Sequence, residues 1–244
     1  MGRPWGGEHQ PTTEPTVLRS ETTPMSTAWD TYAETRPQRP VTNRTGQFTW
    51  WNWTQYPDHG PGTELLGQPQ NVLDLGCGDG RNIAHLVSNG ATGIGVDIAG
   101  LQVERARKRW SPAYYNELTF AHADAVDYLL RSEERFDAIT SVFGAVWFTD
   151  PTVLLPLIVD HLTPGGVFAF SHEPPIQGCY GCQGSYIRPK GTGPPRVVRR
   201  WAYDGPMWFN ILIRAGFVHI TTDIIDAPDS DGVGTLLVRA ERPA

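Results

Sequence analysis

The stretch 72-VLDLGCGDGRN-82 decides the fold of this chain. An apolar run with one acid, Val72 to Leu75, ends at three glycines spaced by two, Gly76, Gly78 and Gly80, and an amphipathic pattern begins directly after them. This order predicts a buried strand, a tight turn and the start of a helix. Glycine has no side chain and adopts positive φ readily, so such a turn lets a ligand lie against bare backbone. The stretch therefore predicts a nucleotide-binding turn.

The glycine spacing distinguishes two kinds of nucleotide turn. The dinucleotide fingerprint is G-x-G-x-x-G, but here the third glycine, Gly80, comes one residue early and Arg81 stands at the fingerprint position. Asp74 also precedes the first glycine by two residues. With this acid the stretch resembles motif I of the class I S-adenosylmethionine-dependent methyltransferases, D-x-G-x-G-x-G.

Length and composition set the class of protein. With 244 residues and 39% hydrophobic composition, the chain has room for one α/β domain. A net charge of −6 and few clustered basic residues disfavour nucleic acid as a partner. No apolar stretch is long enough for a membrane span, and no signal pattern opens the chain. We expect a soluble cytoplasmic protein with a small-molecule substrate.

The three cysteines do not predict a metal site. Cys179 and Cys182 have zinc-ligand spacing, but a structural zinc site needs four ligands and no second pair of this kind exists. We therefore expect no metal and two free thiols.

The N-terminal part divides into a tail and a cap. Residues 1–24 lack apolar periodicity and predict a disordered tail, which leaves residues 25–244 as the methyltransferase domain. Within 25–70, Trp29 to Ala33 resembles the helix that closes over the cofactor in small-molecule methyltransferases. The segment 48-FTWWNWTQY-56 either packs on the sheet or forms a pocket wall, and the two roles are compatible.

Two acids at predicted strand ends complete a cofactor site. Asp97 ends the strand 93–97, about 20 residues after the first glycine, where an acid binds ribose hydroxyls. The resemblance implies that Asp124, after the strand 118–122, binds the adenine amino group, although Asp124 is also placed to cap the next helix. The cofactor wall implied by the resemblance comprises Asp74, Gly76, Cys77, Gly78, Asp97, Ile98, Asp124, Ala125, Val142 and Phe143.

The C-terminal half predicts the rest of the sheet. Residues 135–142 read as a fourth strand, and 162-LTPGG-166 resembles the family's turn into a fifth strand. Residues 172–200 are rich in glycine and proline and predict a lid insertion. After a helix over 201–216, the strands 217–225 and 234–241 are too close for a parallel crossover and predict an antiparallel hairpin. The expected fold is α/β, a Rossmann-like, doubly wound sheet of seven strands, mostly parallel with an antiparallel last strand.

The sequence predicts the acceptor site less sharply. Methyl transfer from a sulfonium depends mainly on alignment, and a base helps only where the acceptor must lose a proton. His172, at the exit of the fifth strand, is the best base candidate, with Glu173 to orient it or to bind a cationic acceptor. The alternative for His172 is a hydrogen-bonded wall residue. Candidate acceptor contacts, each also explained by ordinary packing, are Tyr32, Trp51, Trp147, Tyr186 and Trp201.

These patterns predict a methyltransferase that moves the methyl group of S-adenosylmethionine to an oxygen or nitrogen of a small metabolite and releases S-adenosylhomocysteine. The aromatic cap and the lid insertion resemble enzymes of bacterial specialised metabolism. Two alternatives remain open: an NAD(P)-dependent oxidoreductase of related fold, and a non-catalytic S-adenosylmethionine-binding partner subunit. A homodimer is possible, and the sequence does not identify the acceptor.

Overall fold

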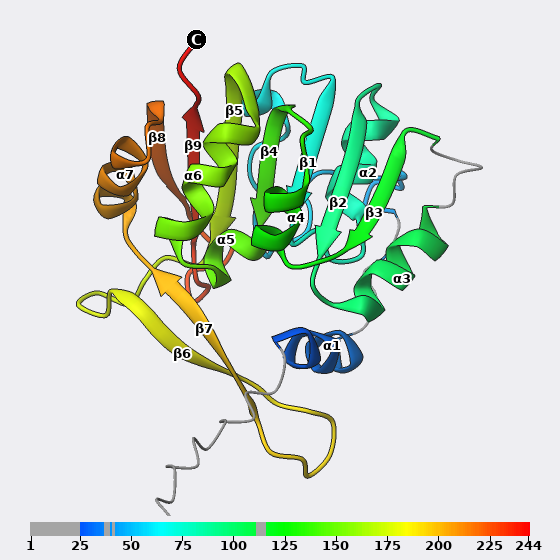
Figure 1. The fold of residues 1–244 in the computed structure, drawn as a ribbon. Helices are drawn as coiled ribbons and strands as arrows, with labels where there is room; N and C mark the ends of the chain where they lie inside the picture. Colours follow the sequence, from blue (N-terminus) through cyan, green and yellow to red (C-terminus); the bar gives the residue numbers. More distant parts are fainter. Residues whose placement is uncertain (1–24, 37–39, 41, 111–115) are drawn as a thin grey trace, which may run out of the picture.

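The computed structural model describes residues 25–36, 40, 42–110 and 116–244 (Figure 1). The tail predicted over residues 1–24 lies outside these residues. Within the described part, no helix combines the length and apolar character needed to span a membrane.

A seven-stranded sheet forms the centre of the molecule, in the order β3-β2-β1-β4-β5-β9-β8. Every neighbouring pair from β3 to β5 is parallel, while β9 runs antiparallel to both β5 and β8. The predicted Rossmann-like sheet with a reversed last strand is confirmed. The strands are β1 (Asn71–Leu75), β2 (Thr92–Asp97), β3 (Leu118–His122), β4 (Phe136–Val142), β5 (Leu162–His172), β8 (Val218–Ile225) and β9 (Thr235–Glu241).

Helices cover both faces of this sheet. Apolar side chains of α4, α6 and α7 pack with Leu73 and Leu75 of β1 into one core. Residues of α2 and α3 pack together, while the segment carrying Trp51 and Trp53 covers Val72. Because the central strands are buried on both faces, they read as apolar runs in the sequence. The helices are α2 (Arg81–Ser88), α3 (Gly100–Arg109), α4 (Ala125–Arg131), α5 (Ala145–Phe148), α6 (Pro151–His161) and α7 (Gly205–Arg214).

The tryptophan segment packs on the sheet, which is the packing alternative of the two we considered. Trp51 and Trp53 are buried and meet edge to face with ring centroids 4.8 Å apart. The Ser171 hydroxyl of β5 donates to the Trp53 carbonyl oxygen at 2.6 Å and ties the segment to the sheet. The short helix η1 (Glu64–Leu66) then leads into β1.

Two elements lie beyond the carboxyl ends of the parallel strands (Figure 1). One is the N-terminal helix α1 (Met25–Thr35), and the other is an antiparallel ribbon of β6 (Gly181–Ile187) and β7 (Arg196–Ala202). Ala28 of α1 is buried against Ile187 and Val198 of the ribbon, in a cluster separate from the main core. We call α1 and this ribbon together the cap.

The ribbon corrects the boundaries that we expected for the insertion. Residues 172–200 are not one irregular loop, because they contain β6 and most of β7, and β7 continues to Ala202. The following helix begins at Gly205 instead of at Trp201. Its start is set by Asp204, whose side chain accepts from the Met207 N–H at 2.9 Å, and by Pro206 in the first turn.

Candidate functional site

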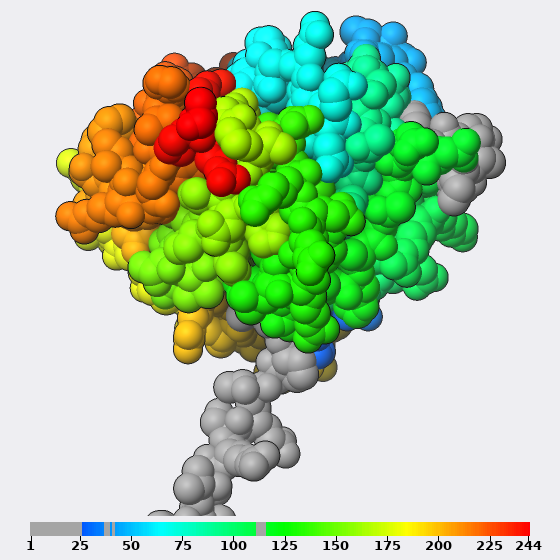
Figure 2. Space-filling view, turned by 45° about the horizontal axis from the view of Figure 1, so that its top comes forward, coloured from blue at the N-terminus to red at the C-terminus, as the bar shows by residue number. Residues whose placement is uncertain are grey.

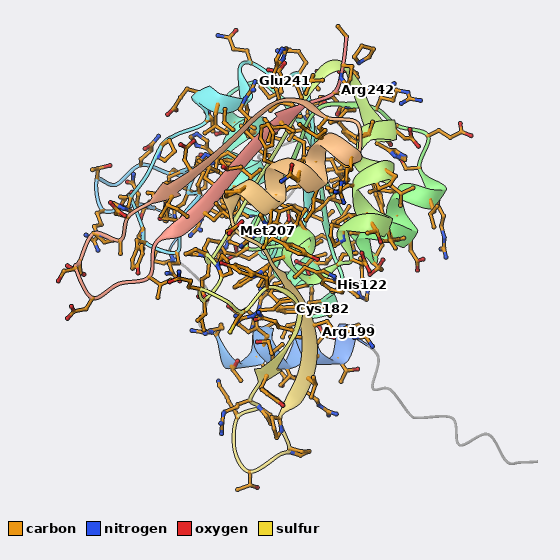
Figure 3. All side chains as sticks on the ribbon, turned by 90° about the vertical axis from the view of Figure 1, so that its left-hand side faces the viewer. His122, Cys182, Arg199, Met207, Glu241 and Arg242 are labelled. Atoms are coloured by element: carbon orange, nitrogen blue, oxygen red, sulfur yellow. The ribbon has the colours of Figure 1, made fainter. Side chains whose placement is uncertain are left out.

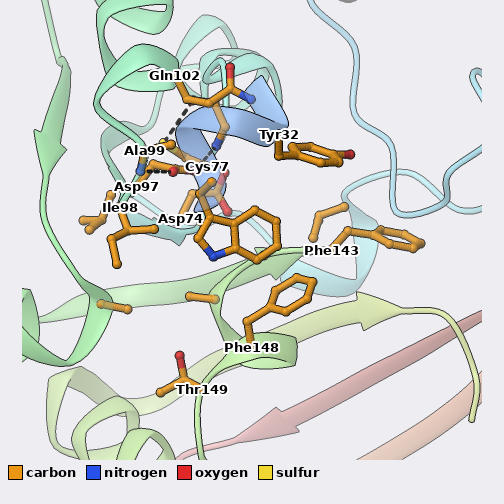
Figure 4. A pocket seen from close by; sticks show the side chains of 18 of the residues that line it. Tyr32, Asp74, Cys77, Asp97, Ile98, Ala99, Gln102, Phe143, Phe148 and Thr149 are labelled. Carbon is orange, nitrogen blue, oxygen red and sulfur yellow. Dashed lines mark hydrogen bonds between the residues drawn. The ribbon is translucent and has the colours of Figure 1, made fainter. Parts of the chain in front are cut away.

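A cavity of about 600 Å³ lies where the carboxyl ends of the strands meet the cap. Its volume is typical of small-molecule sites, and its position is where ligands bind in open parallel sheets. Figure 4 shows Asp97 and Ile98 at one end and the rings of Tyr32, Phe143 and Phe148 at the other. The cavity therefore has a polar end on the sheet and an aromatic end under α1.

The glycine turn after β1 forms the floor of this cavity. All three glycines have positive φ. At Gly76 an added Cβ would lie 2.5 Å from the Ala145 backbone nitrogen, so glycine permits close contact with the loop after β4. At Gly80 it would lie 2.5 Å from the Phe120 ring, whereas at Gly78 the nearest atom would be 3.8 Å away. Two glycines thus close the turn against the protein, and Gly78 leaves its backbone bare toward the cavity.

Asp97 at the end of β2 orders the turn. One carboxylate oxygen accepts from the Gly78 N–H at 2.8 Å, and the other accepts from the Ala99 N–H at 2.8 Å. Burial raises the pKa of Asp97. Since a carboxylate oxygen accepts more than one hydrogen bond, Asp97 retains acceptor capacity toward a ligand in the cavity.

Asp124 has the capping role that the sequence left open, and its predicted role toward adenine stays a prediction. Its side chain accepts from the Val126 N–H at 2.8 Å and from the Asp127 N–H at 3.2 Å, and therefore caps α4. Asp124 and Ala125 also line the cavity. These two hydrogen bonds to the start of α4 fix the Asp124 carboxylate at the polar end of the cavity, two strands away from the glycine turn.

Asp74 and Cys77 place two further ionisable groups at the floor. Asp74 is 2% exposed, and burial raises its pKa to about 7 although the Thr140 hydroxyl donates to it at 3.0 Å. Burial, followed by the neighbouring acids, also raises the pKa of the Cys77 thiol. Cys77 is therefore a neutral wall group.

The structure brings every predicted cofactor residue into the wall of this one cavity. They come from the ends of four neighbouring strands and from the turns that follow them, namely Asp74, Gly76, Cys77, Gly78, Asp97, Ile98, Asp124, Ala125, Val142 and Phe143. Such convergence follows from the parallel topology, which places these strand ends on one edge of the sheet.

The predicted acceptor contacts divide into two groups. Tyr32 of α1 and Trp201 of β7 line the cavity. Trp51 is buried in the core on the sheet, Trp147 is buried beside His172, and Tyr186 is 67% exposed on the ribbon. These last three residues do not line the cavity, so the structure gives them packing or surface roles.

The contacts of His172 do not suit a general base. The ring is fully buried, its Nδ1–H donates to the Glu173 carbonyl oxygen at 2.7 Å, and its Nε2 accepts from the Trp208 indole at 3.0 Å. It also stacks on Trp147 with ring centroids 5.4 Å apart. Burial lowers the pKa of His172 to about 4. The ring is neutral and both nitrogens are engaged, as the alternative of a hydrogen-bonded residue expects, but the ring lies outside the cavity wall.

Glu173 also lies outside the cavity wall. Its carboxylate is 4.0 Å from the Arg200 guanidinium, and its side chain is 38% exposed. It therefore neither orients the imidazole of His172 with its carboxylate nor faces an acceptor in the cavity.

Several wall residues were not predicted from the sequence. Those nearest the cap include Trp29, Arg36, Gln102, Arg105, Phe148, Thr149, Asp150 and Arg199. The ribbon strand β7 carries only a weak signal, the β-branched and aromatic residues Val197, Val198 and Trp201. The sequence predicted a helix over the cofactor at 29–33, but not which of its side chains enter the cavity, because the docking of the helix decides that.

Two polar contacts dock α1 against α3. The Asp30 carboxylate accepts from the Leu101 N–H at 3.0 Å, at the start of α3. The Arg105 guanidinium donates to the Ala33 carbonyl oxygen at 2.8 Å, near the end of α1. These contacts hold Tyr32 and Trp29 over the cavity.

Comparison with known proteins agrees with this geometry. Residues 72–166 match a family profile described as a methyltransferase domain. A trans-aconitate 2-methyltransferase of Methylobacterium radiotolerans is 34% identical over 131 residues, covering 49% of this chain and 48% of that protein. A demethylmenaquinone methyltransferase of Clavibacter sepedonicus is 33% identical over 109 residues, covering 44% and 43%. The chain thus spans about half the length of the curated relatives it matches.

Solved structures share the fold over a larger part of the chain. A Burkholderia thailandensis 1,6-didemethyltoxoflavin-N1-methyltransferase, with 1,6-didemethyltoxoflavin and S-adenosylhomocysteine bound, is 22% identical with a TM-score of 0.54, covering 75% of each chain. An S-adenosylmethionine-dependent methyltransferase of Mesorhizobium loti is 24% identical with a TM-score of 0.54, covering 72% of this chain and 92% of that one.

The fold is that of the class I S-adenosylmethionine-dependent methyltransferases. Residues 72–166, from β1 to the start of β5, match the methyltransferase-domain profile.

Proposed function

We propose that the chain transfers the methyl group of S-adenosylmethionine to an oxygen or nitrogen of a small metabolite. One observation carries this proposal: a single cavity joins the glycine turn and the acids at two neighbouring strand ends to an aromatic chamber under the cap. The dinucleotide alternative has no support from the comparisons.

The residues present fit S-adenosylmethionine. The bare backbone at Gly78 leaves room that a Cβ would occupy, and Gly76 and Gly78 would lie under the methionine portion. Asp97 would accept hydrogen bonds from the ribose hydroxyls, while Asp124 and the backbone at Ala125 would bind the adenine. These hydrogen-bond acceptors match a nucleoside that donates from two hydroxyls and an amino group.

When bound, S-adenosylmethionine supplies a methyl group activated by a sulfonium cation. The protein's own contribution is to hold the acceptor in line and to exclude water, for which the docked α1 and the ribbon are placed. Aromatic faces such as those of Tyr32, Phe143 and Phe148 tolerate a nearby cation. Among the described residues lining the cavity there is no histidine or lysine, so a base for an acceptor that must lose a proton would be one of the lining carboxylates, such as Asp74.

Calorimetry tests the cofactor assignment. We expect the purified chain to bind S-adenosylhomocysteine, and Asp97→Ala to weaken that binding by at least about tenfold because a hydrogen-bonded carboxylate is lost. Asp127→Ala is the matched control, since this exposed acid on α4 is outside the cavity wall. Binding of NAD(P) without binding of S-adenosylhomocysteine would contradict the proposal.

Turnover separates the enzyme from the partner-subunit alternative. Incubation with methyl-labelled S-adenosylmethionine and a small-molecule extract of a cell that makes the protein should place label in a small organic product. Tight cofactor binding with no labelled product from any extract would favour a non-catalytic subunit. A cytoplasmic location and a homodimer stay predictions, and light scattering after size exclusion measures the second.

A further inference from the structure

The acceptor end of the cavity holds two arginines that the cofactor assignment does not use. Arg36 follows α1, and Arg199 lies in β7, so each half of the cap contributes one cation to the same cavity wall. Figure 3 shows Arg199 beside α1, and the two elements are in contact.

The other arginines of this region already have partners, including Arg81, which also lines the cavity and lies over the Trp50 ring, 4.1 Å from its centroid. Arg105 donates to the Ala33 carbonyl oxygen, Arg109 pairs with Asp79 at 2.6 Å, and Arg200, the neighbour of Arg199, lies 4.0 Å from the Glu173 carboxylate. Among the described residues, no carboxylate lies within ion-pair distance of Arg36 or Arg199.

Both arginines are exposed side chains on the cavity wall. The Arg36 guanidinium lies over the Tyr32 ring, 5.2 Å from its centroid, and Tyr32 itself lines the cavity. Arg199 pairs across the ribbon with Gly184, where an added Cβ would meet no atom within 4 Å. The glycine therefore leaves open space beside the Arg199 position.

Five acids line the cavity: Asp74, Asp97 and Asp124 belong to its floor and polar end, Asp79 pairs with Arg109, and Asp150 remains to limit the charge that an acceptor can carry. Asp150 lines the cavity, but one of its oxygens accepts from both the Thr152 N–H and the Thr152 hydroxyl, so its charge serves the start of α6. Two guanidinium groups beside one partly satisfied acid suit a singly charged anion better than a dianion.

We infer that the acceptor carries a carboxylate and that Arg36 and Arg199 bind it, while the rings of Trp29, Tyr32, Phe148 and Trp201 contact its apolar or aromatic part. This inference rests on the proposed function and names the substrate class for the same cavity. Arg36 and Arg199 are specificity residues that contact the acceptor.

Binding of matched probes tests the inference without requiring turnover. The protein is saturated with S-adenosylhomocysteine and titrated calorimetrically with phenylacetate, hexanoate, their neutral amides, and phenyl phosphate. We expect at least one carboxylate to bind about tenfold more tightly than its amide, because a charge-assisted pair replaces a neutral contact. The double variant R36Q/R199Q should abolish this preference and leave amide binding unchanged.

Arg188→Gln is the matched control. This exposed arginine follows β6 on the same ribbon but is outside the cavity wall, so its loss should preserve the preference for carboxylates. Unchanged affinity for S-adenosylhomocysteine shows that each variant is folded.

Four results would overturn the inference. They are equal or undetectable binding of each acid and its amide, a preference that survives in R36Q/R199Q, tighter binding of phenyl phosphate than of both carboxylates, and loss of S-adenosylhomocysteine affinity in R36Q/R199Q, which would place at least one of these two arginines at the cofactor. A wild-type chain that does not bind S-adenosylhomocysteine would instead contradict the proposed function, and the inference would fail with it.

Discussion

At the scale of single residues, Gly76 shows how closely the turn is packed. Its φ is +80°, and an added Cβ would lie 2.5 Å and 2.6 Å from backbone atoms of Ala145 and Gly144. Gly76→Ala should therefore shift the loop after β4, lower the free energy of unfolding by about 1 to 3 kcal/mol and weaken S-adenosylhomocysteine binding. Denaturant unfolding and calorimetry measure the two effects.

Gly165→Ala is the control for Gly76→Ala. Its φ is +75°, but a Cβ there would meet no atom within 4 Å. It should show the cost of the backbone conformation alone and leave cofactor binding intact. Equal loss of cofactor binding in both variants would contradict a steric role for Gly76.

Asp74 gives a prediction about pH. Its pKa of about 7 in the folded chain lies above its ordinary value of 3.8, so the folded state keeps a proton that the unfolded state loses. Stability from this group is therefore fully present below about pH 4 and is lost as pH rises through 7. Asp74→Asn keeps the oxygen that accepts from Thr140 but does not titrate.

The unfolding free energy of Asp74→Asn minus that of the wild type should therefore increase between pH 4 and pH 8. We expect an increase of roughly 2 to 4 kcal/mol, at about 1.4 kcal/mol per pKa unit. Urea unfolding of the ligand-free protein at several pH values measures it. A difference that is constant with pH would show that Asp74 has an ordinary pKa.

Residue types at strand ends could be predicted from the sequence, whereas their hydrogen bonds could not. Asp97 and Asp124 were predictable because parallel strands place their carboxyl ends on one edge. His172 also leaves a strand at that edge, yet Trp208, which occupies its Nε2, lies 36 residues further along the chain. No local pattern at position 172 reports that contact.

At the scale of elements, the docking of α1 on α3 controls the cavity. The Asp30 carboxylate accepts from the Leu101 N–H, a charge-assisted bond of about 1.5 to 3 kcal/mol. Asp30→Ala should speed hydrogen exchange over residues 25–35 and weaken cofactor binding several-fold. Glu34→Ala is the matched control, because Glu34 is exposed on the same helix and is outside the cavity wall.

Unchanged exchange over α1 in Asp30→Ala would show that the helix is held by the Arg105 hydrogen bond to Ala33 and by its apolar contacts. Those contacts include Trp29 and Phe148, whose ring centroids are 4.4 Å apart.

The ribbon was the element that the sequence predicted least well. Glycine and proline between 173 and 195 suggest an irregular loop, but β6 alternates exposed and half-buried residues and pairs with β7 along its whole length. Its apolar partner is α1, more than 140 residues earlier in the chain, so the stabilising contact is not local. The lid role of the ribbon remains a prediction.

At the scale of the whole molecule, the cap and the main core are separate apolar clusters. Leu212→Ala in the main core should lower the global free energy of unfolding by about 2 to 5 kcal/mol. Val198→Ala in the cap should speed hydrogen exchange over 25–35 and 181–202 while global unfolding changes little. An equal loss of global stability in both variants would show that cap and core unfold together.

The central sheet was predictable because each of its strands carries a local signal, either an apolar run or a turn such as Leu162 to Gly166. The reversed last strand followed from the short connection between residues 225 and 235. The position of β9 between β5 and β8 is a property of the whole sheet. Figure 2 shows the chain end (red) at the surface beside this half of the molecule.

That position of β9 has a consequence for synthesis on the ribosome. β8 forms its sheet hydrogen bonds only with β9 in the described chain, and β9 is translated after every other strand of this sheet. The half of the sheet from β3 to β5 can assemble while the ribosome is still adding residues, but β8 stays unpaired until the stretch Thr235–Glu241 has emerged. The nascent protein therefore exposes the bare edge of β5 until β9 has been made, which is the period when a chaperone would protect it.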